Sequence, residues 1–351
     1  MKNKKFFLES LIKWNRNKNK RKMPWKGEKD PYKIWISEII LQQTRVQQGL
    51  NYYNRFIEAF PNVESLANAS EQAVYKLWEG LGYYSRCKNL IASAKYINDE
   101  LNGIFPDKYE EIIALKGIGS YTAAAIASFA FGHPYAVLDG NVFRVLSRFF
   151  GIEAPIDSTE GKKLFGLLAN KLIDKKNAAE YNQALMDFGA VICKPLQPLC
   201  GECPLQRECI AYKKELVNML PVKEKNIKQR QRFFNYLLIE AGDKIYVNQR
   251  KEKDIWHNLF EFILFETNNL VQEKAFLKSK EFISLFYGCD FVITKVSKVY
   301  TQKLTHQTIT GRFFHISLNA TAISLSQYKQ VSLKELALLP FPKFITSYLQ
   351  D

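Results

Sequence analysis

The sequence predicts a mainly α-helical N-terminal region followed by a smaller α+β domain. Apolar side chains recur at helical spacing as far as residue 191, whereas short strand-like runs rich in Phe, Ile, Val and Tyr begin after residue 232. Four cysteines crowd into residues 193–209, and a basic segment poor in apolar residues follows them. We therefore expect domains at 1–212 and 233–351, joined by a basic linker at 213–232.

Composition supports real hydrophobic cores and an anionic partner. The chain has 351 residues, 47% of them hydrophobic, and its 50 Lys and Arg exceed its 35 Asp and Glu to give a formal charge of +15. Such a field favours nucleic acid or an anionic membrane surface, although a solvated basic surface is the simpler alternative. No run of about 18 apolar residues and no signal segment occurs, so we expect no membrane span. We expect the protein to be cytoplasmic and, in a prokaryote, to be associated with the nucleoid.

The first helices carry a candidate acid. A short amphipathic helix precedes the breaking Met-Pro-Trp at 23–25, and Pro31 can start the next helix at its first turn. In that helix Glu38 lies among Trp35, Ile39 and other apolar residues. Burial raises a carboxyl pKa, as a general acid requires. The alternative is a Glu that points outward and pairs with a Lys.

Helical patterns continue at 52–60, 63–67, 73–78 and 86–101. Between the last two, Gly80-Leu81-Gly82-Tyr83-Tyr84 has glycines flanking aromatic side chains. Such a loop can push a ring between bases, although core tyrosines behind an ordinary turn are an equal alternative.

Two glycines separate a pair of helices at 109–115 and 120–131. We expect positive φ at Gly117 and Gly119 and a side-chain cap from Ser120 or Thr122, which makes a helix-hairpin-helix. Its turn presents N–H groups to a phosphate, or to a cation that bridges to one. An ordinary glycine-ended helix pair has the same spacing.

Asp139 precedes a helical run at 142–150 and is its natural N-cap. The N-terminal amides would keep its carboxylate ionised with a low pKa. Helices at 162–172 and 178–191 complete the region. Beyond the linker, strands are expected at 233–240, 244–249, 260–266, 291–300 and 311–318, with helices at 274–286 and 332–338.

The four cysteines follow the pattern C-x6-C-x2-C-x5-C and are Cys193, Cys200, Cys203 and Cys209. Four thiolates in so short a loop hold zinc or an iron–sulfur cluster. Zinc sites usually pair two C-x2-C knuckles, and this loop has one short pair.

These motifs together resemble the helix-hairpin-helix glycosylases with a cysteine-loop cluster, the endonuclease III-like enzymes. Within them the chain is similar to the adenine DNA glycosylases. The resemblance covers about residues 5–212, with a weaker match to the end, and is carried by the four cysteines and by segments 23–25, 35–44, 80–84, 115–125, 138–142 and 182–187. It implies a [4Fe–4S] cluster on the four cysteines rather than zinc.

The resemblance also implies roles for the candidate residues. Glu38 would protonate adenine, Asp139 would stabilise the sugar cation, and Asn141 and Tyr121 would orient the Asp and the sugar. The implied substrate is duplex DNA with adenine opposite 8-oxoguanine or guanine, bound by a monomer. The implied DNA contacts are Gln42 and Tyr83 in the hole left by the flipped base, Trp25 and Gln183 in the base pocket, Gln43 beside Gln42, and Gly117 and Gly119 on the backbone, where a monovalent cation could sit.

One position distinguishes enzymes that only remove a base from relatives that also cut the strand. The strand-cutting relatives have a nucleophilic Lys where this chain has Tyr121, and a phenol cannot form an imine. We therefore expect base removal without strong strand cutting. The alternatives are a bifunctional endonuclease III-like glycosylase and AP lyase, and a non-enzymatic DNA-binding scaffold that carries a cluster.

The C-terminal domain resembles the Nudix-like module that reads oxidised guanine. Leu304-Thr305-His306 stands where that family often has Phe-Ser-His, so Thr305 and His306 are the implied reading residues. The acidic Nudix signature is missing around residues 256–266, so nucleotide pyrophosphohydrolase activity is not expected.

Overall fold

The computed structural model describes residues 2–44, 46–224, 229–319 and 323–351 and divides into two compact units. The first comprises Met1–Asn68 and Asn89–Lys225, and the second comprises Ala69–Lys88 and Asn226–Asp351. The domain boundaries expected at 212 and 232 stay a prediction, and residues 225–228 of the expected linker lie outside the described part of the chain.

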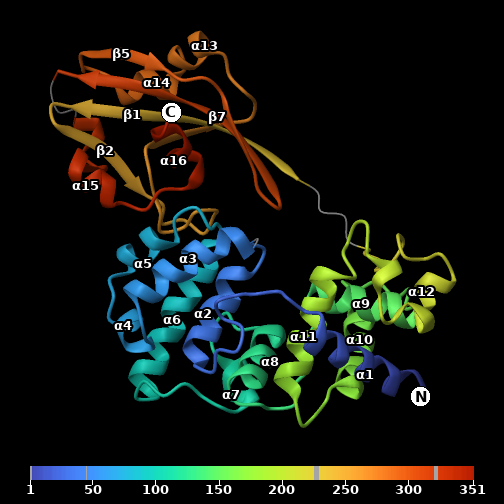
Figure 1. Cartoon of the computed structure of the whole chain (residues 1–351). Coiled ribbons are helices and arrows are strands. Elements are labelled where there is room, and N and C mark those ends of the chain that lie inside the picture. Colours follow the sequence, from blue (N-terminus) through green and yellow to red (C-terminus); the bar gives the residue numbers. More distant parts are fainter. Residues whose placement is uncertain (1, 45, 225–228, 320–322) are drawn as a thin grey trace. The chain divides into compact units, whose positions relative to one another are not determined.

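The first unit is helical, as expected, and so confirms the predicted class of the N-terminal region (Figure 1). α6 begins in the second unit and continues into the first. The elements are α1 (Lys2–Asn17), α2 (Pro31–Leu41), α3 (Val46–Ala59), α4 (Val63–Ala67), α6 (Tyr84–Glu100), α7 (Tyr109–Ala114), α8 (Ser120–Phe129), α9 (Gly140–Phe150), α10 (Thr159–Leu172), α11 (Ala178–Val191), the 3-10 turns η1 (Cys200–Glu202) and η2 (Gln206–Glu208), and α12 (Ile210–Lys213).

The main core of this unit joins the N-terminal helix to the later ones. α11 packs against α9, α8 and α1, while α2 packs against α8. Buried Phe7, Leu11, Val145 and Phe188 are fully or almost fully shielded from solvent. The helices α2, α8, α9 and α11 are thereby fixed side by side, and the functional side chains described below project from them.

Local capping explains where two of these helices start. Asp30 caps α2 by accepting from the N–H of Tyr32 at 2.9 Å, with Pro31 in the first turn. Asp139 caps α9 in the same way, and Gly151 ends that helix in the left-handed conformation. Both starts agree with the sequence-based expectation.

The glycine hairpin between α7 and α8 is present, but it differs in two details from the expectation. Gly117 has φ +81°, and a Cβ there would lie 2.5 Å from the Asn89 Cβ, so only glycine fits. Gly119 is extended instead, with φ −96°, because it is the N-cap of α8. The expected cap from Ser120 or Thr122 is wrong: no side chain caps α8, since both residues lie inside the helix.

The second unit combines α5 (Glu71–Trp78) with a mixed eight-stranded sheet and four helices. Its central strands, β1 (Arg230–Ala241) and β7 (Gln307–Leu318), run parallel over twelve residue pairs. The remaining elements are β2 (Lys244–Gln249), β3 (Phe260–Glu261), β4 (Ile263–Thr267), β5 (Phe291–Val296), β6 (Tyr300–Lys303), β8 (Lys329–Ser332), α13 (Glu273–Leu277), α14 (Lys280–Leu285), η3 (Ile323–Leu325), α15 (Leu333–Leu338) and α16 (Lys343–Leu349).

This sheet confirms the predicted α+β class, with three elements divided more finely than expected. The run at 260–266 forms β3 and β4, the run at 291–300 forms β5 and β6, and the helix expected at 274–286 is α13 and α14. β6 and β7 form a hairpin whose turn holds Thr305 and His306, closed by the N–H of Leu304 donating to Gln307 O at 2.7 Å. The two expected reading residues therefore lie at a hairpin tip.

None of the described helices is long and apolar enough to cross a lipid bilayer.

Candidate active site

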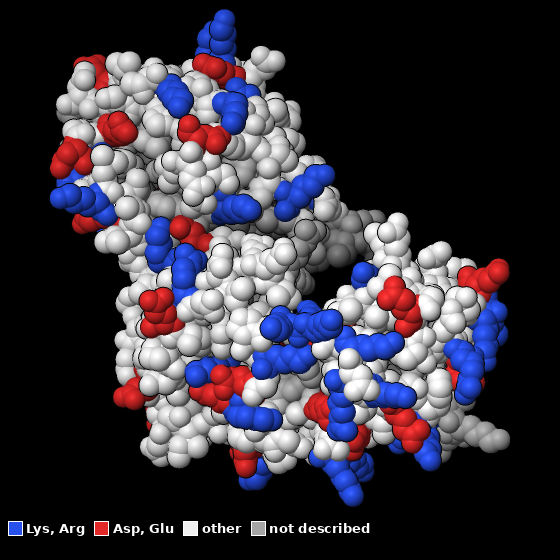
Figure 2. Space-filling model, in the orientation of Figure 1, with Lys and Arg blue, Asp and Glu red and all other residues white. Residues whose placement is uncertain are grey.

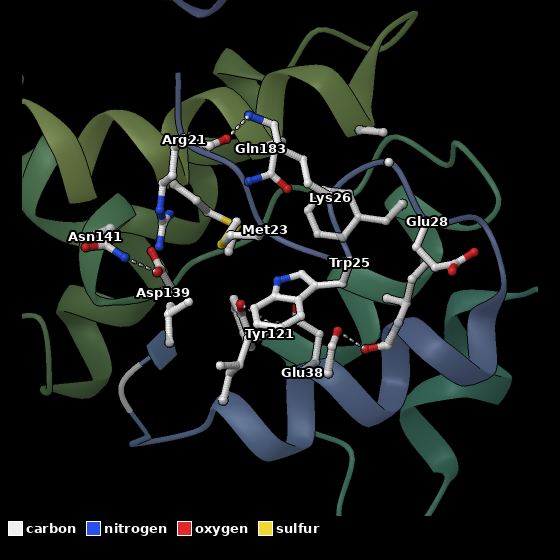
Figure 3. Close-up of a pocket in the computed structure, with 18 of the residues that line it drawn as sticks. Arg21, Met23, Trp25, Lys26, Glu28, Glu38, Tyr121, Asp139, Asn141 and Gln183 are labelled. Atoms are coloured by element: carbon white, nitrogen blue, oxygen red, sulfur yellow. Dashed lines mark hydrogen bonds between the residues drawn. The ribbon is translucent and has the colours of Figure 1, made fainter. Parts of the chain in front are cut away.

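A cavity of about 590 Å³ opens in the first unit, and residues of α2, α8, α9 and α11 line it together with the segment before α2. Eight residues that the sequence singled out line it together, although they span almost 160 positions of the chain: Trp25, Glu38, Gln42, Gln43, Tyr121, Asp139, Asn141 and Gln183. In Figure 3, Trp25 lies over Tyr121, with Asp139 to one side and Glu38 to the other.

Glu38 sits in the wall of this cavity with only 7% of its surface exposed. Burial raises its pKa from 4.5 to about 7, although a hydrogen bond from Tyr121 opposes the rise. The buried position follows from the apolar residues beside it on α2. The expected rise is therefore confirmed, and the carboxyl group is partly protonated at neutral pH.

Tyr121 lies in the first turn of α8 and donates its phenol hydrogen to Oε2 of Glu38 at 2.6 Å. Burial, with the nearby charges of Glu38 and Asp139, raises the pKa of Tyr121 well above its usual value of 10. The phenol consequently stays protonated and acts as a permanent donor to Glu38.

Asp139 is held by two donors at the start of α9. Its Oδ1 accepts from the N–H of Val142 at 2.7 Å, and its Oδ2 accepts from Asn141 Nδ2 at 2.6 Å. Both bonds favour the ionised form, but burial outweighs them and raises the pKa of Asp139 above 3.8. The expected low pKa is thus wrong, because the expectation counted the local donors and not the enclosing cavity.

Arg144 is a functional contact that the sequence analysis did not identify. It lies one turn after Asn141 on α9, is 8% exposed, and donates from Nη2 to Asn141 Oδ1 at 2.8 Å. The same guanidinium donates to Gly189 O at 2.7 Å and to Cys193 O at 2.7 Å. It therefore links the partner of Asp139 to the start of the cysteine loop. The i, i+3 spacing from Asn141 was the available signal.

The rim of the cavity beside Trp25 is organised by a buried carboxylate, Asp187, on α11. It accepts from Arg21 at 2.7 Å, from Lys26 at 2.9 Å and from Gln183 at 3.0 Å, and its side chain is fully buried. A buried charge needs such pairing, and the arrangement fixes two cations and an amide at the cavity mouth.

Gln42 and Gln43 follow the end of α2 at the opposite side of the cavity. Gln42 donates to Thr122 Oγ1 at 3.3 Å, while Gln43 takes φ +57°. Non-glycine residues adopt this left-handed conformation infrequently, and Gln, unlike Asn, has no special preference for it. Both side chains are presented at the cavity rather than packed in the core.

The hairpin glycines lie apart from the cavity lining, in the turn that precedes α8. Ser93 Oγ donates to Lys116 O at 2.9 Å and ties the turn to α6. A Cβ on Gly119 would meet nothing within 4 Å, so the backbone there is open. An open turn at a helix N-terminus without a side-chain cap suits an anion.

The four cysteines of the loop after α11 line one small cavity of about 30 Å³. All are free thiols. Among the described residues, no three His, Cys, Asp or Glu side chains converge as ligands of a single metal ion do. Arg148 braces the loop from α9, donating to Lys194 O at 2.7 Å and to the sulfur of Cys193 at 3.5 Å.

The second unit has its own cavity, of about 790 Å³, which Tyr83, Thr305 and His306 line. The hydroxyl groups of Tyr83 and Thr305 share a hydrogen bond. Two residues that the sequence singled out for separate reasons, and which are 222 positions apart, are therefore in contact.

Acidic side chains in this unit are neutralised by buried arginines. Arg250 donates to Glu261 at 2.6 Å and to Asp254 at 2.9 Å, and Arg232 makes two bonds to Glu266, at 2.7 and 2.6 Å. Carboxylates held in this way are not available as a cluster of metal ligands.

Basic side chains gather on the face of the first unit shown in Figure 2. The N-terminal segment is rich in basic residues: residues 1–30 hold 11 Lys or Arg, of which Arg21 and Lys26 line the cavity. A polyanion would be attracted to the opening of the cavity.

Comparison with known proteins agrees with both units. A family model described as "HhH-GPD superfamily base excision DNA repair protein" matches residues 36–169, and one described as "NUDIX domain" matches residues 235–351. Among solved structures, a thermostable thymine-DNA glycosylase is 29% identical with a TM-score of 0.56, and covers 61% of this chain and 98% of its own. A non-covalent endonuclease III–DNA complex, 22% identical with a TM-score of 0.53, shares the fold.

Relatives in sequence cover more of the chain. The adenine DNA glycosylase of Buchnera aphidicola subsp. Baizongia pistaciae is 33% identical over 329 residues, which span 93% of this chain and 90% of the relative. That of Homo sapiens is 41% identical over 215 residues, 58% of this chain and 39% of its own. One cavity contains both Glu38 and Asp139, and the Buchnera relative matches this chain along almost its whole length. The chain therefore belongs to the adenine DNA glycosylase family.

Proposed function

We propose that this protein is a monofunctional DNA glycosylase that removes adenine mispaired with 8-oxoguanine or guanine in duplex DNA. The observation that carries the proposal is the pair of buried carboxyl groups, Glu38 and Asp139, in one cavity with Tyr121 between them. Breaking an N-glycosidic bond needs a proton for the leaving base and a stabiliser for the oxocarbenium-like sugar. The two carboxyl groups supply both.

Glu38 is the proposed general acid. Its pKa of about 7 means that a substantial fraction carries a proton at neutral pH, whereas an ordinary Glu would carry almost none. Adenine, flipped out of the helix into the cavity, would take this proton on a ring nitrogen. Protonation converts the base into a neutral leaving group, and the C1′–N9 bond can then break with the electron pair going to the base.

Asp139 is the proposed stabiliser of the sugar. The Val142 N–H and the Asn141 amide fix its carboxylate at 2.7 and 2.6 Å, so little reorganisation is needed as positive charge develops on the deoxyribose. Both donors favour the anion, and a cationic sugar favours it further. Water then adds to C1′ to complete the hydrolysis.

Tyr121 supports base removal without strand cutting. A lyase needs an amine that condenses with C1′ of the sugar, and the phenol that occupies this position is instead committed to Glu38. This contact is the reason for preferring the monofunctional activity over the bifunctional glycosylase and AP lyase.

DNA contacts are proposed for the residues around and beyond the cavity. Trp25 and Gln183 would hold the base, and Gln42, Gln43 and Tyr83 would fill the gap in the duplex. The backbone would lie on the hairpin turn of Gly117 and Gly119, with a monovalent cation between. Thr305 and His306, at the β6–β7 tip, would read the oxidised guanine. The protein would act as a monomer where the DNA lies, in the cytoplasm of a prokaryotic cell.

A [4Fe–4S] cluster is proposed for Cys193, Cys200, Cys203 and Cys209. All four line one cavity, which suits a cluster with one ligand per iron. The loop contains one short C-x2-C pair, whereas zinc sites usually combine two. A cluster bound there would join the four cysteines and so stabilise the loop that Arg148 contacts.

The decisive experiment measures adenine release from duplexes in which adenine faces 8-oxoguanine, guanine or thymine, with and without alkali. We expect release from the first two and strand breaks only after alkali. Glu38→Gln should lower the single-turnover rate about 10²- to 10⁴-fold while DNA affinity is kept. Full activity of that variant would refute the mechanism, and breaks without alkali, with borohydride trapping, would favour the lyase.

A further inference from the structure

The segment between α5 and α6 holds an exposed aromatic ring on a strained backbone. Tyr83 is 43% exposed and has φ +49°, a conformation that non-glycine residues seldom adopt. Gly80 and Gly82 before it also have positive φ, at +91° and +75°. Such a turn persists only where surrounding contacts hold it. The contacts that hold Tyr83 are therefore informative.

The first of these contacts is a guanidinium between two rings. The Arg86 Cζ lies 5.3 Å from the centre of the Tyr83 ring and 5.5 Å from the centre of the Trp78 ring. Trp78 is fully buried, and α5 fixes it. The ring of Tyr83 is thus connected to the interior of the second unit through Arg86, and this arrangement is called the Trp78–Arg86–Tyr83 stack.

The second contact fixes the backbone of the same turn. Arg86 Nη2 donates to Gly82 O at 3.4 Å, and Trp78 Nε1 donates to the same carbonyl at 3.1 Å. The N–H of Arg86 also donates to Tyr83 O at 2.8 Å. Arg86 therefore holds both the ring and the peptide group that precedes it.

The chemistry of the stack requires arginine in particular. Burial lowers the pKa of Arg86 to about 10, so the side chain is still charged at neutral pH. A partly desolvated cation binds an aromatic face more strongly than an exposed one. The planar guanidinium can lie on two rings and donate to a carbonyl at once, whereas a lysine ammonium lacks the plane and the fork.

We propose that Arg86 is a positioning residue that holds Tyr83 as a rigid wedge for insertion into the duplex. The proposal rests on the proposed function, since Tyr83 needs a duplex to enter, and Arg86 acts through Tyr83 without touching the reacting atoms. A ring held in place before binding loses little conformational freedom when it enters the base stack. A direct contact between Arg86 and a DNA phosphate is the competing explanation.

The test is a double-mutant cycle on the full-length protein with Arg86→Met, Arg86→Lys and Tyr83→Ala. Wedge insertion is followed by the fluorescence of 2-aminopurine beside the mispair, and adenine release gives kcat/KM. Arg86→Met should lower kcat/KM about ten- to thirtyfold, the equivalent of one desolvated cation–π contact, and weaken the fluorescence rise. In the Tyr83→Ala protein the same substitution should change kcat/KM less than about threefold.

Arg55→Met is the matched control, because Arg55 also lies over a tyrosine, Tyr52, at 5.0 Å, but away from both cavities. It should leave both readouts unchanged. Arg86→Lys keeps the charge and folds most readily; it should behave like Arg86→Met. Equal losses in both Tyr83 backgrounds, or full rescue by Lys, would overturn the proposal in favour of a structural or phosphate-binding role. If the proposed function is wrong, the unmutated protein will release no adenine, which is a different result from either of these.

Discussion

The hydroxyl group of Tyr121 lies 2.6 Å from Oε2 of Glu38 and donates to it, so the phenol and the buried acid form one titrating unit. The bond favours the ionised carboxylate and opposes the effect of burial on the pKa of Glu38. The pH range in which Glu38 holds a proton is thus set by two opposing contributions, one from the cavity and one from a single side chain.

Tyr121→Phe should move the alkaline limb of the pH–rate profile to higher pH. Without the phenol the ionised form of Glu38 loses a donor, so its pKa rises above about 7 and the protonated acid persists further into the alkaline range. Single-turnover adenine release between pH 5 and pH 9 measures the limb. Tyr135→Phe, which removes a phenol bonded to Glu110 outside the cavity, should leave the limb in place. A limb that moves to lower pH in Tyr121→Phe would contradict the assignment.

Glu38→Gln should stabilise the protein at neutral and alkaline pH. The folded-state pKa of Glu38 is about 7 and its ordinary value is 4.5. The favourable neutral form is therefore fully populated below about pH 4.5, and its contribution is lost as the pH rises towards and through 7. Glutamine stays neutral throughout. The Tm difference between variant and parent should be near zero at pH 4.5, grow up to pH 7 and then level off.

That pH dependence is measured by thermal unfolding in buffers of matched ionic strength. Glu111→Gln, at an exposed side chain that pairs with Lys108, is the control and should give no growing difference. A Glu38→Gln protein that loses stability as the pH rises would show that Glu38 is ionised and favourably bound in the folded state.

Arg144→Met should lower both stability and turnover. The guanidinium satisfies Asn141 Oδ1 together with the carbonyls of Gly189 and Cys193, and each buried carbonyl left without its donor costs about 1–3 kcal/mol. Asn141 also loses the contact that orients it towards Asp139, so kcat should fall more than DNA affinity. Urea unfolding and single-turnover rates measure the two effects.

Arg16→Gln is the control for that substitution. Arg16 pairs with Glu180 while 61% of its side chain is exposed, and solvent screens such exposed pairs so that they contribute little to stability. Arg144→Lys should recover little, because a compact ammonium lacks the planar fork whose Nε, Nη1 and Nη2 reach four separate acceptors. Normal turnover in Arg144→Met would show that the contact of Arg144 with the cysteine loop and Asn141 does not affect catalysis.

Gly189→Ala should impair catalysis through its effect on packing. A Cβ at Gly189 would lie 2.6 Å from the Asn141 Cβ and 3.0 Å from Asn141 O, so α11 and α9 would have to move apart. A displacement of this size beside the reacting groups lowers kcat about 100-fold. The control is Gly166→Ala on α10, where a Cβ meets nothing within 4 Å. That change should leave kcat alone and stabilise the helix by about 0.5–1 kcal/mol.

Local rules were enough to predict the start of α2 at Pro31, the N-cap of α9 and the strand-rich second unit, whereas α3 begins at Val46, six residues before the expected start. Asp139 was predicted as an N-cap because the bond that makes it one spans three residues, and Glu38 was predicted as buried because its neighbours on α2 are apolar. The adenine DNA glycosylase resemblance was confirmed by relatives along most of the chain. The roles of the site residues stay predictions.

Properties that depend on distant segments could not be predicted in the same way. The pKa of Asp139 depends on a cavity wall built from four helices, and the acceptors of Arg144 include Cys193, which lies 49 positions away. Gly119 was assigned positive φ from its residue type, whereas its role as the N-cap of α8 requires an extended backbone. In each case the tertiary arrangement overrode the local signal.

Asp139 caps α9 and is also the residue proposed to stabilise the sugar cation, and this has a consequence for inherited variation. Substitution of Asp139 by Val or Ala would remove the cap, which is worth about 0.5–2 kcal/mol, as well as the charge. A loss of 1–2 kcal/mol can lower the cellular amount of a protein several-fold. Asp139→Asn keeps the side-chain oxygen that accepts from the Val142 N–H and should give an inactive but abundant protein. Asp139→Val and Asp139→Ala should give a scarce one. Mutation rates in cells carrying these alleles would therefore reflect how much enzyme is present as well as how fast each molecule works.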